Sequence, residues 1–411
     1  MWWDSSEITL YSSVIFSIIS VIVLYLVGSG FLRLISSFIK KVDAFGSFDL
    51  LQKINFRVVF GLIYIFVIIL FFSLFNLSYP SMTLLVIALA VFGFVASRRS
   101  FKLNLPKKIG FKKGARSYFL IIIVFVLLLA VIFLSSMLIT GLNGSTNDDG
   151  ADHTLMISIL LNHPNSLITR SAQPFADFTL YYPSFPHVIC AFLATLLDVP
   201  IQNIVIMVSV FLPCLIVLSF YSIIKCIFDN KLLSILGSMI AAFFTTGLLY
   251  SPISWGGLPL LLSLYFSISS MALIYVFLLK KKMTLLNALI LGVIFFIASQ
   301  TYPIALLIIS LWSLLILITK LLTKIRNKNE FNGFVSYFNR TNLVTIIVFL
   351  IPILFGIPYF YSIYTNNIAG HQFSQLNSQS NSLSETMKTR IGFNWLLDIP
   401  ALSHFFSGFG Q

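Results

Sequence analysis

Apolar residues occupy this chain in repeated unbroken runs of about 20 residues, separated by short polar segments. A helix that rises 1.5 Å per residue needs about that length to cross roughly 30 Å of hydrocarbon. The runs do not alternate with the period of two that the strands of a membrane barrel would show. They predict transmembrane helices near residues 8–31, 57–76, 81–97, 118–139, 202–224, 232–250, 258–279, 284–299, 303–321 and 342–363.

Composition agrees with this all-α, polytopic membrane protein of about ten transmembrane helices. Of the 411 residues, 58% are hydrophobic and only 9% are charged, and the mean hydropathy is +0.98. Asp4 and Glu7 precede the first run and no small-residue cleavage site follows it, so we expect a retained helix instead of a signal peptide. Cys190, Cys214 and Cys226 lack metal-type spacing and are predicted to be small core residues.

The net charge of +13 is concentrated in loops between the runs, which is typical of cytoplasmic loops and not of nucleic-acid binding. The five basic loops hold Arg33, Lys40, Lys41, Lys53 and Arg57; Arg98, Arg99, Lys102, Lys107, Lys108, Lys112, Lys113 and Arg116; Lys225 and Lys231; Lys280 to Lys282; and Lys320, Lys324, Arg326, Lys328 and Arg340. All five lie inside only if both termini are outside the cell membrane. We expect these cations to contact anionic headgroups of membrane lipids.

Two shorter segments are predicted to be in-plane helices of a large outside loop, residues 140–201. Ser184 to Leu197 is apolar, but 14 residues rise only about 21 Å, too little for a crossing. Its small or polar stripe, His187, Ala191, Thr195 and Asp198, is typical of an interfacial helix. The segment from Asp152 to His163 has a similar stripe in Thr154, Ser158 and Asn162.

The start of this outside loop is the strongest candidate for a functional site. Asp148, Asp149, Asp152 and His153 fall within six residues, in a chain with only 13 Asp and Glu. Acids at the mouth of a membrane helix are typical of substrate, ion or proton handling. The alternative is a solvated loop in which Asp152 caps a helix.

These motifs, in this order, resemble the GT-C superfamily of integral-membrane glycosyltransferases, which includes the oligosaccharyltransferase catalytic subunits. The acidic cluster is followed by Tyr182-Pro183-Ser184-Phe185-Pro186-His187, which is similar to a Tyr-Pro-Pro-x-x-His/Asp element of that superfamily, and by Ser254-Trp255-Gly256-Gly257-Leu258-Pro259. The resemblance covers roughly residues 118 to 363. Three predicted spans precede the acidic cluster, Ser184 replaces the second proline, and no Trp-Trp-Asp follows the core, where the oligosaccharyltransferases carry the signature that reads acceptor peptides.

The resemblance implies sugar transfer from a polyprenyl-phosphate lipid to an unidentified glycan, lipid or protein acceptor. Asp149 is then the best candidate for the base that deprotonates the acceptor hydroxyl, with Asp148 and Asp152 as alternates. His153, Tyr182, His187, Trp255 and Tyr302 are candidates for substrate contacts, and Arg170 and Arg390 for the lipid phosphate. These motifs specify no cofactor. A divalent metal, Mg or Mn, held by Asp152, His153 and His187 stays an alternative.

The chain thus divides into three predicted parts: residues 1–117 with three helices and basic loops, a GT-C-like core at 118–363, and an outside segment at 364–411 that would act as a lid. Three other functions stay open. A transporter would place acids near the bilayer midplane. A polysaccharide polymerase or ligase, or a non-catalytic subunit in cell-envelope glycan assembly, would also use outside loops.

Overall fold

The computed structural model describes residues 8–38, 48–97, 111–142, 144, 148–169, 183–248, 253, 257–280, 284–326, 344 and 346–354. The elements are α1 (Leu10–Phe38), α2 (Leu50–Ser73), α3 (Tyr79–Ser97), α4 (Phe111–Ile139), α5 (Asp148–Asn162), α6 (Ser166–Thr169), α7 (Ser184–Leu197), α8 (Ile201–Phe228), α9 (Lys231–Leu248), α11 (Leu258–Tyr275) with a π-helical extension (Val276–Lys280), α12 (Leu285–Thr301) and α13 (Pro303–Arg326). Within these ranges the fold is all-helical, as predicted.

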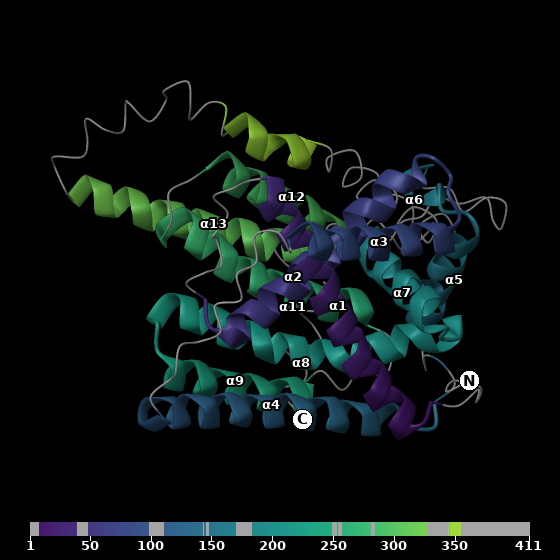
Figure 1. The fold of residues 1–411 in the computed structure, drawn as a ribbon, viewed down its shortest axis with the longest axis horizontal. Coiled ribbons are helices and arrows are strands. Elements are labelled where there is room, and N and C mark those ends of the chain that lie inside the picture. Colours follow the sequence, from purple (N-terminus) through teal and green to yellow (C-terminus); the bar gives the residue numbers. More distant parts are fainter. Residues whose placement is uncertain are drawn as a thin grey trace, which may run out of the picture.

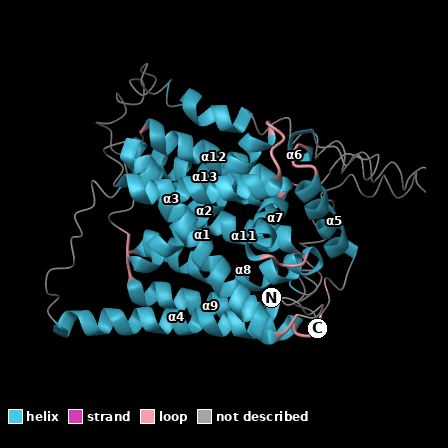
Figure 2. Ribbon diagram, turned by 45° about the vertical axis from the view of Figure 1, so that its right-hand side comes forward, coloured by secondary structure: helices cyan, strands magenta, loops and turns pink. Residues whose placement is uncertain are grey.

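The long helices lie alongside one another in a bundle with two distinct ends (Figure 1). At one end, which we call the α5 end, the backbone of Ile8 bonds to Leu142, and the Tyr79 hydroxyl at the start of α3 donates to the Val188 carbonyl of α7 at 2.9 Å. Helices α5, α6 and α7 gather there (Figures 1 and 2).

The opposite end, which we call the basic end, carries the helix ends that adjoin the predicted cytoplasmic loops. The Tyr221 hydroxyl of α8 donates to the Asp49 carboxylate before α2 at 2.6 Å, and Lys320 Nζ of α13 donates to the Leu278 carbonyl after α11 at 2.9 Å. The bundle therefore separates these helix ends from α5 and α7. Which end faces the cytoplasm stays a prediction from the positive charges.

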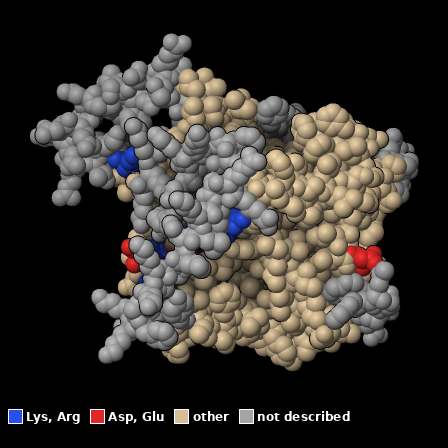
Figure 3. All heavy atoms as spheres, viewed as in Figure 1, with Lys and Arg blue, Asp and Glu red and all other residues tan. Residues whose placement is uncertain are grey.

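Seven helices in the described ranges are long and apolar enough to cross a membrane: α1, α2, α3, α4, α8, α11 with its extension, and α13. The predicted crossings at 232–250 and 284–299 correspond to the shorter helices α9 and α12. Apolar side chains such as Phe125, Leu129 and Phe133 are exposed along α4, and charged side chains are few on the face in Figure 3. Such a surface suits contact with lipid.

Glycine backbones bring α1, α2 and α3 into close contact. A Cβ added at Gly28 would overlap the Arg57 carbonyl of α2, and one added at Gly93 of α3 would overlap the Gly30 carbonyl of α1. Small residues of this kind let membrane helices pack backbone to backbone, where dispersion contacts replace the hydrophobic driving force. The three N-terminal helices are therefore a tightly packed unit.

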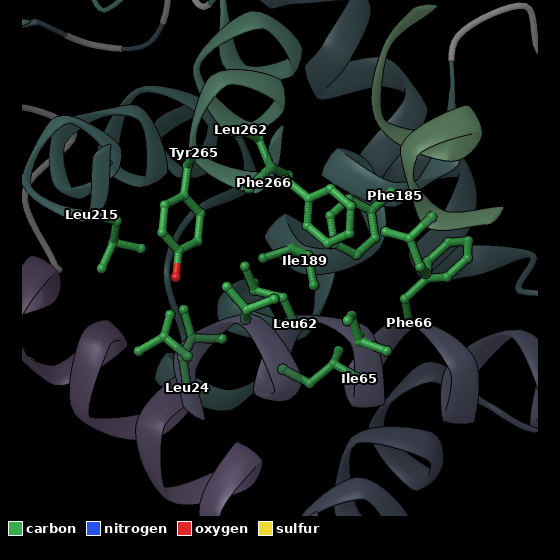
Figure 4. Packing of buried hydrophobic residues seen from close by; sticks show 14 of the residues in the cluster. Leu24, Leu62, Ile65, Phe66, Phe185, Ile189, Leu215, Leu262, Tyr265 and Phe266 are labelled. Carbon is green, nitrogen blue, oxygen red and sulfur yellow. The ribbon is translucent and has the colours of Figure 1, made fainter. Parts of the chain in front are cut away.

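The same helices share one core with the rest of the bundle. Leu24 of α1, Phe66 of α2, Phe185 of α7 and Tyr265 and Phe266 of α11 converge in it (Figure 4). The Phe185 ring contacts Phe66 and Phe266 edge-on, with centroids 5.3 and 5.7 Å apart. Residues from both sides of the predicted boundary at residue 117 thus form a single buried cluster.

Two local predictions are wrong. Arg33, Lys53 and Arg57 were expected in the first basic loop but lie in helices, because α1 continues to Phe38 and α2 begins at Leu50. The reason for the early start is a capping box, in which Asp49 Oδ1 accepts from the Gln52 backbone and Gln52 Oε1 accepts from the Asp49 backbone.

The interfacial character predicted for Ser184 to Leu197 is also wrong. Side chains 184–194 of α7 are all buried, since α7 is packed against α2, α3, α5, α8, α11 and α12. The stripe that begins with His187 and Ala191 faces protein, and only its end, at Asp198, is exposed. The helix does have the predicted 14 residues, and its neighbours in the chain, α6 and α8, both contact α5.

Candidate functional site

Helix α5 carries the acidic cluster and packs one face onto the bundle. His153, Ile157 and Leu160 are buried at helical spacing, while Thr154 and Ser158 are half-buried and Asn162 is exposed. The amphipathic helix predicted here is confirmed, but it begins at Asp148, so Asp152 is in its second turn and is not the N-cap. The acids are therefore part of a helix instead of a solvated loop.

A buried histidine pair joins α5 to α7. His153 Nδ1 and His187 Nε2 are 3.0 Å apart, and the two side chains are 0% and 2% exposed. His187 Nδ1 lies 2.9 Å from the Pro183 carbonyl oxygen. A carbonyl can only accept, so His187 Nδ1 carries a hydrogen. In the neutral pair His187 Nε2 then accepts from His153 Nδ1, and the lone pair of His153 is on Nε2.

This order of donors limits the charge that the pair can hold. If both rings were protonated, two N–H groups would face each other across 3.0 Å. The bonded pair can therefore take up only one proton beyond the neutral state. A pair of this kind can fix the orientation of a neighbouring group or hold one mobile proton.

The first turns of α7 are wedged between bundle helices. Phe66, which Phe185 contacts, lies seven residues before the end of α2, or roughly 10 Å from it along the helix axis. The Tyr79 hydroxyl holds the Val188 carbonyl one turn further along α7. Neither aromatic contact was predicted, because ring partners so far apart in sequence carry no local signal. Together they fix the position of His187.

The sequence positions of the acidic residues fall on two lines of α5. Asp149 precedes His153 by four residues and so shares a line with His153 and Ile157, whereas Asp148 and Asp152 share a neighbouring line. Asp152 is half-buried, and the side chains of Asp148 and Asp149 lie outside the described part of the chain. A helix N-terminus favours negative charge on residues in its first turn.

Of the remaining candidates, Tyr302 is the one within the described residues. Tyr302 is half-buried and in extended conformation at the corner between α12 and α13, where its carbonyl accepts from the Ala305 backbone. The end of α12 lies near the start of α7, since Phe296 contacts Phe66, the ring that Phe185 also contacts, with centroids 6.1 Å apart. The other four, Arg170, Tyr182, Trp255 and Arg390, lie outside the described residues.

The described residues do not fit a divalent metal at the histidine pair. Two of the four ring nitrogens, His153 Nδ1 and His187 Nε2, are hydrogen-bonded to each other. Mg and Mn prefer oxygen ligands, and within the described ranges no three His, Cys, Asp or Glu side chains lie close enough together to hold a metal ion. We therefore derive no chemical step from a metal.

Comparison with known proteins identifies the family but no activity. The model of a family of unknown function, DUF6541, matches residues 58–398. This match covers most of the chain, so the protein belongs to that family. No curated protein and no solved structure matches it.

Proposed function

We propose that this DUF6541 protein is a membrane glycosyltransferase that moves a sugar from a polyprenyl-phosphate donor to an acceptor on the outer face of the membrane. The observation that supports the proposal most directly is the convergence of the acidic start of α5 and the buried His153–His187 pair at the end of the bundle away from the basic loops. Buried polar and ionisable groups in a membrane protein are typical of functional sites.

In the proposed reaction the acceptor oxygen forms a bond to the anomeric carbon of the sugar as the bond from that carbon to the phosphate oxygen breaks. Asp149 takes the acceptor proton as general base, and polyprenyl phosphate leaves with the bonding electrons. Asp148 or Asp152 takes this role if Asp149 does not reach the acceptor. Tyr302 and the undescribed Tyr182, Trp255, Arg170 and Arg390 remain candidates for binding the sugar and the lipid phosphate.

The histidine pair has a positioning role in this proposal. His153 lies one turn after Asp149, and its bond to His187 holds that turn of α5 against α7. The contact between His187 and Pro183 in turn fixes the rotation of the His187 ring. The base would therefore be attached to a rigid element, which favours a productive distance to the reacting centre.

The test is transfer by purified protein in vesicles, supplied with a panel of polyprenyl-phosphate sugars and with candidate glycan, lipid and peptide acceptors, and assayed for released polyprenyl phosphate. We expect Asp149→Asn to lower turnover by roughly 100-fold, the share usual for general-base catalysis. The matched control is Asp198→Asn, which makes the same change at an exposed left-handed residue at the end of α7. Asn tolerates that conformation, so the control should keep the parent rate.

If Asp148→Asn, Asp149→Asn and Asp152→Asn each transfer sugar as fast as the parent, the acidic cluster is not the catalytic centre. If the parent releases no polyprenyl phosphate from any donor in the panel, the glycosyltransferase proposal fails. A non-catalytic subunit of glycan assembly, or a polymerase or ligase that uses other residues, would then be the better explanation.

A further inference from the structure

Two arginines lie inside helices near the basic end, far from the histidine pair. Arg33 is five residues before the end of α1, and Arg57 is seven residues after the start of α2, which places them roughly 8 and 10 Å from those helix ends. Both side chains are half-buried. An arginine inside a membrane helix is energetically costly and is often part of a binding site.

Aromatic side chains hold both guanidinium groups. Arg57 donates to the Tyr25 hydroxyl, and its Cζ lies 5.2 Å from the centroid of the Tyr25 ring. Arg33 Cζ lies 4.4 Å from the centroid of Phe94 on α3. Both contacts are within the range of cation–π attraction. Gly28, five residues before Arg33 on α1, lies against the backbone carbonyl of Arg57, so the two arginines belong to adjoining turns of α1 and α2 and their charges interact.

The glycine contacts described above build this arrangement. Gly28 lies against the carbonyl of Arg57 itself, which fixes α2 at the position where Arg57 meets Tyr25. Gly93, next to Phe94, lies against the carbonyl of Gly30, and this contact fixes α3 at the position where Phe94 meets Arg33. The two arginines and their aromatic partners thus come from three helices whose backbones cannot separate without losing these contacts.

We propose that Arg33 and Arg57 form a binding site for the phosphate of an anionic phospholipid in the leaflet at the basic end. Two neighbouring positive charges repel each other, and a shared anion removes that repulsion. The guanidinium fork matches the geometry of phosphate oxygens. Arg33 lies within roughly 8 Å of the end of α1, a distance that a long arginine side chain can cover toward lipid headgroups, and the cytoplasmic leaflet is rich in anionic lipids. The proposal does not depend on the glycosyltransferase function.

The experiment compares the purified parent with the double variant Arg33→Gln/Arg57→Gln in phosphatidylcholine vesicles with and without phosphatidylglycerol. The readouts are the thermal unfolding midpoint and the phosphatidylglycerol retained in native mass spectrometry. We expect the affinity for phosphatidylglycerol to fall about tenfold or more, because charge-assisted hydrogen bonds are lost. Lys231→Gln, which removes a cation from the start of α9, is the matched control and should keep the parent affinity.

The variant Arg33→Lys/Arg57→Lys controls for a folding defect in the Gln variant. It keeps both positive charges and removes only the forked guanidinium geometry. An affinity between those of the parent and the Gln variant supports the proposal. Equal retention of phosphatidylglycerol by the Gln variant and by Lys231→Gln overturns it. Inorganic phosphate added to vesicles of pure phosphatidylcholine separates the two sources of the anion. If phosphate raises the unfolding midpoint of the parent and not that of the Gln variant, the site is supported but is assigned to a soluble phosphate group.

Discussion

Replacing His187 by Phe tests the contact on which the candidate site depends. The Phe ring fills the space of the imidazole, so little cavity is created. The variant removes the acceptor of the 3.0 Å bond from His153 Nδ1 and the donor of the 2.9 Å bond to the Pro183 carbonyl. Because His153 is 0% exposed, water cannot replace the lost acceptor without a rearrangement of α5.

The two losses can be estimated separately. A buried N–H deprived of its acceptor costs about 1–3 kcal/mol, and loss of an ordinary hydrogen bond costs about 0.5–1.5 kcal/mol. The free energy of unfolding of His187→Phe should therefore fall by about 2–4 kcal/mol. In His153→Phe/His187→Phe no such donor is left, so the double variant should lose about 1–3 kcal/mol less than the sum of the two single variants.

The measurement is reversible denaturant unfolding of the four proteins in one detergent. A coupling free energy near zero would refute the direct bond between the two rings. A His187→Phe variant as stable as the parent would show that the His153 N–H does not lose a buried acceptor when His187 is replaced.

Three further predictions concern the scaffold. Gly28→Ala should lower the free energy of unfolding by more than about 2 kcal/mol by forcing backbones apart, whereas Gly237→Ala, which meets only a flexible Ile side chain, should have little effect in the same unfolding assay. Tyr221→Phe removes a 2.6 Å bond to the carboxylate that caps α2 and should lower stability by about 1.5–3 kcal/mol; an unchanged melting curve would argue against that bond. Ser145→Cys should react with an impermeant maleimide from outside intact cells and Lys231→Cys only after permeabilisation, and the reverse pattern would invert the predicted topology.

The labelling experiment can be done in the parent background. All three native cysteines are buried, and burial raises the pKa of the Cys190 thiol on α7 well above its usual range. The reactive thiolate is therefore scarce at neutral pH and becomes more abundant only as the pH rises. Rapid labelling of Cys190 in the parent at neutral pH, located by peptide mass spectrometry, would show that α7 is accessible and would contradict its burial.

The sequence predicted the class of the fold well, because long apolar runs have few alternatives in a membrane protein. Periodicity also predicted that α5 is amphipathic. The boundaries of α1 and α2 were missed, since hydropathy follows apolar residues and gives no weight to the capping box at Asp49 and Gln52. A helix can extend beyond the hydrocarbon, and its polar turns then look like a loop.

The candidate site was predicted only in part. His153 and His187 were each proposed from composition and from the resemblance, but their contact depends on α5 and α7 packing together, which no local pattern records. The polar stripe of α7 was correctly identified and wrongly placed, because a stripe that faces a histidine partner looks the same in sequence as one that faces water. The position of Phe185 between Phe66 and Phe266 likewise depends on elements far apart in the chain.

The burial of α7 has a consequence for the order in which the chain is assembled. Some of the helices around it, α2 and α3, precede it during synthesis, whereas α8, α11 and α12 follow it. Its apolar side chains therefore emerge before their final partners exist. A short helix with one polar stripe can rest at the membrane surface during that interval, and we expect it to enter its place only when α11 supplies Phe266 to close around Phe185. The polar stripe would then face water at the membrane surface while the chain is being synthesised and face the partner helices once the protein is folded.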